Sequence, residues 1–209
     1  MSQIEVAAWS RPEATRSGTP LVIALHGRGS DESSMIQLSD DLPNDMTLVA
    51  PRGPVPLEEG HTWFVNEGIG RPVEASIKES VQAFLDWLDA LPVEHSQIFL
   101  LGFSAGTAMA GAVLMTDPSR FSGAVLLSGT LPWEVNLDAR DGRLADMPVL
   151  WSIDPADEVI PAELAQRSLV WLTERSGAQV TVTDHPGGHA IYPTQVEEVM
   201  TFLSGLPAS

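Results

Sequence analysis

The sequence predicts an α/β fold with a mainly parallel central sheet and helices on both faces of that sheet. Three observations indicate it: short, almost continuously apolar runs alternate with longer amphipathic ones, Gly or Pro punctuates them, and no repeat or linker divides the chain. Such apolar runs are typical of strands buried on both faces, and their alternation with helices is typical of a parallel sheet. At 209 residues, the chain has the length of one domain, which we expect to span residues 1–209.

The expected strands are seven short runs dominated by apolar side chains. In chain order they are Ile4–Trp9, Leu21–Leu25, Met46–Ala50, Gln97–Phe103, Gly123–Leu127, Pro148–Ile153 and Gln179–Thr183. Pro or Gly bounds the first three, as is typical of strand ends. Because ligands bind beyond the carboxyl ends of strands in such sheets, functional residues are expected in the loops that follow strands.

Four longer segments are the expected helices. They are Glu74–Leu91, Ala105–Met115, Pro161–Ser176 and Pro193–Leu203. In the first, apolar side chains recur every three or four residues with carboxylates between them, and Pro92 follows its end. Two connections, Arg52–Val73 and Gly129–Met147, are too long to be simple links. Loops of that length are usually functional or mobile.

The composition excludes several classes of function. The chain has 11 Lys and Arg against 28 Asp and Glu, a net charge of −17, and Lys78 is its only lysine. This acidity repels phosphate backbones, so no nucleic-acid partner is expected. The absence of cysteine excludes disulfides, thiolate metal sites and a cysteine nucleophile. No run approaches 18 apolar residues and Met1–Ser10 is unlike a signal peptide, so we expect a soluble, cytoplasmic protein without stable membrane insertion.

One short motif, Gly102-Phe103-Ser104-Ala105-Gly106, has the form G-x-S-x-G. It follows an apolar strand and precedes a helix of small residues, which is the strand–turn–helix setting of a nucleophile elbow. A serine at such a turn holds a strained backbone, and the flanking glycines prevent collisions there. The Ser104 hydroxyl would then project above the sheet, with the Ala105 amide directed at a developing oxyanion. The alternative is a tight turn whose glycines serve packing only.

A serine nucleophile needs a base, and the base needs a carboxylate that orients it. We expect His189 to be the base because it follows Gly-Gly in the loop between the last strand and the last helix. His185, at the end of that strand, is the alternative. Asp157 and Asp154 both follow one strand; Asp157 is the expected acid, although it could instead cap the next helix, and Asp154 is the alternative acid. The order Ser104, Asp157, His189 is that of α/β-hydrolases.

A second glycine-rich turn, His26-Gly27-Arg28-Gly29, follows the strand Leu21–Leu25. Such a turn can direct a backbone N–H at the same point as the Ala105 amide and so complete an oxyanion hole of two donors. Without the serine motif, a plain glycine-rich connection would be the better interpretation.

The whole chain resembles the phospholipase/carboxylesterase family of α/β-hydrolases, which includes small carboxylesterases, lysophospholipases and acyl-protein thioesterases. The matching pieces occur in the family's order and span nearly the full length. They are Leu25-His26-Gly27-Arg28-Gly29, Pro51-Arg52-Gly53-Pro54 with Thr62-Trp63-Phe64, Gly102-Phe103-Ser104-Ala105-Gly106, Asp157-Glu158-Val159-Ile160-Pro161 and Gly188-His189. The resemblance implies an α/β-hydrolase fold, here without a large lid, because the chain is short.

The resemblance implies a serine carboxylesterase that hydrolyses small or medium acyl esters through Ser104, His189 and Asp157, with the amides of Arg28 and Ala105 as oxyanion donors. No metal or organic cofactor is expected. Thioesterase members usually carry leucine where Arg28 stands and glutamine where Ala105 stands, which favours simple esters over lipidated proteins. Lysophospholipase or acyl thioesterase activity from the same site stays open, as does a non-catalytic binding protein on this fold.

The long loops supply the candidate substrate-binding residues. Trp63, Phe64 and Ile69 are expected to line one side of an acyl groove, and Leu131 with Trp133 the other. The alternative is that these side chains anchor irregular loops to the core. Because the net charge disfavours polyanions, the expected partner is a small neutral acyl ester, and self-association into a homodimer stays open.

Overall fold

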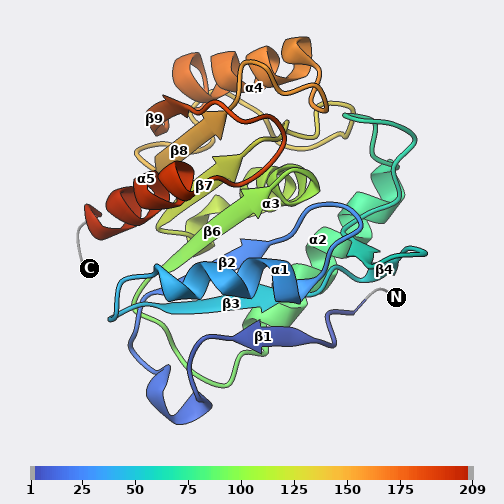
Figure 1. The fold of residues 1–209 in the computed structure, drawn as a ribbon. Helices are drawn as coiled ribbons and strands as arrows, with labels where there is room; N and C mark the ends of the chain where they lie inside the picture. The colour runs from blue at the N-terminus through green and yellow to red at the C-terminus, as the bar shows by residue number, and fades with distance from the viewer. Residues whose placement is uncertain (1–2, 207–209) are drawn as a thin grey trace.

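The computed structural model describes residues 3–206 and is built around a seven-stranded sheet (Figure 1). Its strands are β1 Ala7–Trp9, β2 Leu21–Leu25, β3 Thr47–Pro51, β6 Ile98–Phe103, β7 Gly123–Leu127, β8 Pro148–Ile153 and β9 Gln179–Asp184. A separate two-stranded ribbon consists of β4 Val55–Pro56 and β5 His61–Thr62.

The strand order in the sheet is β1-β3-β2-β6-β7-β8-β9. Every neighbouring pair from β3 to β9 is parallel, and only the edge strand β1 runs antiparallel, against β3. The prediction of a mainly parallel sheet is therefore confirmed. Its physical basis is burial: β2, β3 and β7 are fully buried along their length, as strands covered on both faces must be.

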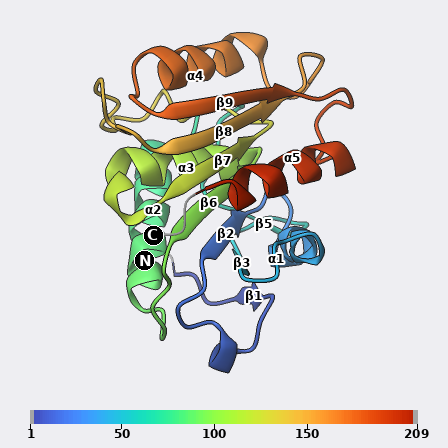
Figure 2. The same cartoon turned by 90° about the vertical axis from the view of Figure 1, so that its left-hand side faces the viewer.

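Helices cover both faces of the sheet (Figure 2). The α-helices are α1 Glu32–Ile36, α2 Glu74–Asp89, α3 Ala105–Thr116, α4 Ala162–Glu174 and α5 Pro193–Ser204, and short 3-10 turns occupy Glu13–Thr15, Gln37–Asp40 and Pro118–Arg120. Alternate residues of the strands enter two separate cores. In β2, Leu21, Ile23 and Leu25 pack toward α2 and α3, whereas Val22 and Ala24 pack toward α1 and α5.

The structure adds short elements that hydrophobic periodicity does not reveal. The helix α1 has five residues, too few to show a helical repeat, and the β4–β5 ribbon lies inside the connection expected to be irregular. The first strand is shorter than expected because only Ala7 to Trp9 pair with β3. No helix among residues 3–206 is long and apolar enough to cross a membrane.

The chain reverses its direction of travel across the sheet between β2 and β6. From β2 it proceeds through α1 to β3, and it then returns past β2 to β6, which pairs with the other side of β2. The segments after β2 and after β6 consequently leave toward opposite faces of the sheet, since α1 packs in one core and α3 in the other. Such a switch point is the usual ligand site of open α/β sheets.

Candidate active site

Ser104 lies at the sharp turn between β6 and α3. Its backbone has φ 56° and ψ −114°, a conformation that non-glycine residues rarely adopt. Two backbone hydrogen bonds hold this turn: the Ser104 N–H donates to Leu127 O at 3.0 Å, and Ser104 O accepts from the Thr107 N–H at 3.0 Å. The strand–turn–helix setting expected from the sequence is thus present, together with the expected backbone strain.

The glycines on either side of Ser104 are required by close backbone contacts. A Cβ on Gly106 would lie 2.0 Å from Leu25 O, and one on Gly102 would lie 2.4 Å from Gly106 O. Both contacts are with backbone atoms, which cannot rotate away. The spacing G-x-S-x-G therefore lets α3 begin directly against β2 and β6, with Ser104 at the point of contact.

A chain of hydrogen bonds joins Ser104 to two residues from distant loops. His189 Nε2 lies 2.8 Å from Ser104 Oγ, and His189 Nδ1 lies 2.8 Å from Asp157 Oδ2. The other carboxylate oxygen of Asp157 accepts from the amides of Val159 and Ile160 at 2.8 and 3.1 Å. The Asp157 side chain is 2% exposed, so it has little contact with water that would compete for the imidazole.

The two alternative partners lie elsewhere. His185 is buried and stacks obliquely on Tyr192, with 5.8 Å between the ring centroids. Asp154 directs its carboxylate at backbone amides, including that of Gly187, 2.7 Å from Oδ2. The structure thus brings His189 and Asp157 together with Ser104, but not His185 or Asp154.

The glycine-rich turn after β2 is organised by the buried imidazole of His26. Its Nε2 accepts from the Gly53 N–H at 2.9 Å, so its Nδ1 carries the proton and donates to Gly27 O at 2.7 Å. Burial lowers the pKa of His26, which agrees with a neutral ring. The indole N–H of Trp63 also donates to His26 O at 2.8 Å.

Among residues 3–206, the backbone amides of Arg28 and Ala105 donate no hydrogen bond to the protein, and both residues line the same cavity as Ser104. Ala105 is the first residue of α3, where helix amides carry partial positive charge. The turn after β2 lies close by, since a Cβ on Gly27 would be 3.5 Å from Ser104 Cβ. Within the same described range, no cluster of three or more His, Asp or Glu side chains could hold a metal ion.

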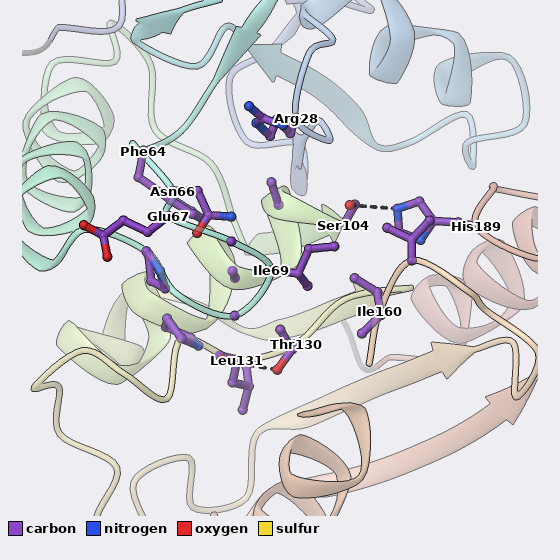
Figure 3. Close-up of a pocket in the computed structure, with 17 residues that line it drawn as sticks. Arg28, Phe64, Asn66, Glu67, Ile69, Ser104, Thr130, Leu131, Ile160 and His189 are labelled. Carbon is purple, nitrogen blue, oxygen red and sulfur yellow. Dashed lines mark hydrogen bonds between the residues drawn. The ribbon is translucent and has the colours of Figure 1, made fainter. Parts of the chain in front are cut away.

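A cavity of about 490 Å³ opens at Ser104 and His189 (Figure 3). This volume is within the usual range for small-molecule sites. Three of the five expected substrate-binding residues line it: Phe64, Ile69 and Leu131. Charged side chains on its walls are Arg28 and Glu67.

The prediction for the other two aromatic residues is corrected. Trp63 is fully buried and does not line the cavity. Its indole N–H donates to His26 O, and its own carbonyl oxygen accepts from Ser80 Oγ. Trp133 lies outside the cavity lining, where its indole N–H donates to Ser168 at 3.0 Å and its ring meets Trp171 edge-on. Both therefore anchor loops to the core, the alternative interpretation.

The wall residues that the sequence did not indicate include Ile160 and Thr130. Each could have been suspected from its position. Ile160 lies three residues beyond Asp157, and Thr130 follows the end of β7, so both belong to loops at the carboxyl edge of the sheet.

Comparison with known proteins identifies the family of the chain. Residues 11–206 match the phospholipase/carboxylesterase family. The carboxylesterase SOBER1 of Arabidopsis thaliana is 28% identical over 202 residues, covering 87% of this chain and 88% of its own. An acyl-protein thioesterase 1 of Cryptococcus neoformans is 25% identical over 218 residues, covering 88% and 91%.

Solved structures show the same fold. A carboxylesterase from Mesorhizobium loti superposes with a TM-score of 0.79 at 28% identity, covering 92% of each chain. The Bacillus cereus carboxylesterase superposes at 0.81 with 18% identity, covering 96% of this chain and 94% of its own, which shows the fold alone. The fold is that of the α/β-hydrolases. The chain belongs to the phospholipase/carboxylesterase family, and it is a carboxylic ester hydrolase.

Proposed function

We propose that this protein is a serine carboxylesterase that cleaves small or medium neutral acyl esters through an acyl-enzyme. The observation that carries the proposal is the unbroken hydrogen-bond chain from Asp157 through His189 to Ser104, which ends at an apolar cavity. Nucleophile, base and orienting carboxylate within hydrogen-bond reach are the recognised signature of covalent catalysis by serine.

In the acylation step, neutral His189 takes the hydroxyl proton of Ser104 as Oγ attacks the ester carbonyl. Asp157 accepts the Nδ1 proton of His189 in a hydrogen bond and so keeps Nε2 as the acceptor that faces Ser104. The carbonyl oxygen becomes an oxyanion held by the amides of Arg28 and Ala105. A single donor of this kind typically lowers the activation barrier by about 3–4 kcal/mol.

The tetrahedral intermediate then collapses. His189 gives its proton to the departing alkoxide, the alcohol leaves, and the acyl group remains on Ser104. In the second half, water loses a proton to His189 and attacks the acyl carbonyl. The acid is released when Ser104 Oγ recovers the proton, so the protein ends as it began.

The cavity walls support neutral acyl groups as substrates. Phe64, Leu131 and Ile160 present apolar surface to it, and burial of a methylene is worth roughly 0.8 kcal/mol. The net charge of −17 disfavours polyanionic substrates. We therefore expect short to medium aliphatic esters to be preferred.

The proposal is tested by hydrolysis of p-nitrophenyl acetate and butyrate by the wild type and by Ser104→Ala. We expect turnover by the wild type and its loss in the variant, with an unchanged circular dichroism spectrum. Retained turnover in Ser104→Ala would refute the assignment. An acyl-chain series of esters, thioesters and lysophospholipids would then report the leaving group and chain length that the site prefers.

A further inference from the structure

The two loops that carry Asp157 and His189 leave from adjacent strand ends. β8 and β9 are parallel neighbours, and Ile153 at the end of one pairs with Asp184 at the end of the other. Asp157 lies four residues beyond β8, and His189 lies five beyond β9. Both strands end before these residues, so the backbone hydrogen bonds of the sheet do not fix the position of Asp157 relative to His189. Contacts between the two loops must do so.

The buried carboxylate of Asp154 bridges these loops. Its Oδ2 accepts from the Gly187 N–H at 2.7 Å and from the Gly188 N–H, while its Oδ1 accepts from the Ala156 N–H at 2.7 Å. Asp154 is 4% exposed, and both of its oxygens are used. One side chain from the acid loop therefore fixes the two amides that immediately precede His189.

The segment before His189 needs such a restraint. Gly187 has φ 148° and Gly188 has φ 79°, and a Cβ on Gly188 would meet nothing within 4 Å, so open space surrounds it. Two successive glycines have the largest conformational freedom of any dipeptide. Apart from Asp154, two bonds to carbonyl oxygens restrain this turn: the Tyr192 hydroxyl donates to Gly187 O at 2.5 Å, and the Ala190 N–H donates to Gly188 O at 3.1 Å.

We propose that Asp154 is a positioning residue for the reaction: its carboxylate holds the Gly187–Gly188 turn so that His189 reaches both Ser104 and Asp157. The inference rests on the proposed function of that site. The bonds from Gly188 and Ala156 also lower the pKa of Asp154, so the acceptor is ionised throughout the neutral range.

The kinetic test compares Asp154→Ala, Asp154→Asn and Asp184→Asn. Asp184 is the matched control, because it is an exposed carboxylate at the neighbouring strand end, just before the His189 loop, and it makes no hydrogen bond to the described chain through its side chain. We expect Asp154→Ala to lower kcat about 100-fold with KM within about twofold, because misplacement of a catalytic group by about 1 Å has that effect. Asp154→Asn keeps one acceptor oxygen and should lose less, and Asp184→Asn should match the wild type.

A second test of the Asp154 contacts is structural and does not depend on enzymatic activity. Pro186–Gly187 is the only Pro-Gly pair and Gly187–Gly188 the only Gly-Gly pair in the chain. Selective ¹³C/¹⁵N labelling of proline and glycine therefore assigns both amides by NMR. We expect slow hydrogen exchange at both amides in the wild type and in Asp184→Asn, fast exchange in Asp154→Ala, and rates between these two in Asp154→Asn, which keeps one acceptor oxygen.

These experiments distinguish failure of the proposed role of Asp154 from failure of the proposed esterase function. Wild-type kcat in a folded Asp154→Ala, a raised KM at unchanged kcat, or fast exchange at both amides of the wild type would each overturn the inference. If Asp154→Ala does not fold, the test is the comparison of wild type with Asp154→Asn: equal exchange rates at the Gly187 and Gly188 amides would overturn the inference. Failure of the wild type to react with a fluorophosphonate would instead overturn the proposed function, whatever the glycine amides do.

Discussion

Gly106 lies directly beneath the carbonyl of Leu25, so close that a Cβ at Gly106 would be 2.0 Å from that oxygen. This contact joins the first turn of α3 to the end of β2. It therefore sets the separation between Ser104, which precedes α3, and the glycine-rich turn that follows β2. The geometry of the site therefore requires glycine at position 106, because any side chain there would collide with the backbone of β2.

We accordingly expect Gly106→Ala to destabilise the protein by about 1–3 kcal/mol, the usual cost of overpacking a site that cannot yield. Urea denaturation measures this free energy of unfolding. Gly205→Ala is the control, since a Cβ there would be 3.4 Å from the nearest atom, an ordinary contact. Equal stability of the two variants would contradict the close approach.

The oxyanion donor that we propose at position 28 is a backbone amide, so the Arg28 side chain and its N–H can be tested separately. Arg28→Ala keeps the amide and should retain kcat toward p-nitrophenyl acetate. Arg28→Pro removes the donor and should lower kcat about 10²–10³-fold. Matching melting temperatures must accompany this comparison. Similar kcat values for the two folded variants would place the second donor elsewhere.

Stability is expected to depend on the protonation of His26. Its pKa in the folded protein is lowered from 6.5 by burial, so unfolding takes up a proton in acid. The stabilisation is complete above about pH 6.5 and is lost as the pH falls toward the lowered value. Urea denaturation between about pH 5 and 8 should show this loss in the wild type and a smaller one in His26→Gln. Burial also lowers the pKa of His95, which contributes to both curves, so the difference between them reports His26; parallel curves would exclude it.

Ile69 lies on the cavity wall with 43% of its surface exposed. Ile69→Ala should reduce the preference of kcat/KM for p-nitrophenyl hexanoate over acetate by about two- to fourfold, because part of the apolar contact to the longer chain is lost. Trp133→Phe is the matched control, since Trp133 lies outside the lining, and it should alter stability without altering this ratio. If Trp133→Phe changed this kcat/KM ratio and Ile69→Ala did not, Trp133 rather than Ile69 would line the acyl site.

Much of this arrangement could be predicted from the sequence, because parallel strands place their following loops at one edge. That rule alone brings Ser104, Asp157 and His189 to one place. It could not separate the roles of Asp157 and Asp154, since both follow β8 and the direction of each carboxylate depends on how the loop turns. The partners of Asp154, Gly187 and Gly188, lie more than 30 residues away.

Aromatic residues in long loops were the least predictable part of the site. Trp63 and Phe64 are neighbours in sequence, yet Phe64 faces the cavity while Trp63 is held beneath it by the carbonyl of His26. The bond that decides this joins residues 37 positions apart. Composition and periodicity contain no signal for such a contact, because it arises only when the chain is folded.

The central claim is that His189 and Asp157 activate Ser104 as a nucleophile. The most direct measurement is labelling by a fluorophosphonate, read by mass spectrometry of the intact protein and its peptides. We predict one adduct per wild-type chain, located on Ser104, and none on Ser104→Ala. Equal labelling of both proteins, or an adduct on a different serine, would contradict the account.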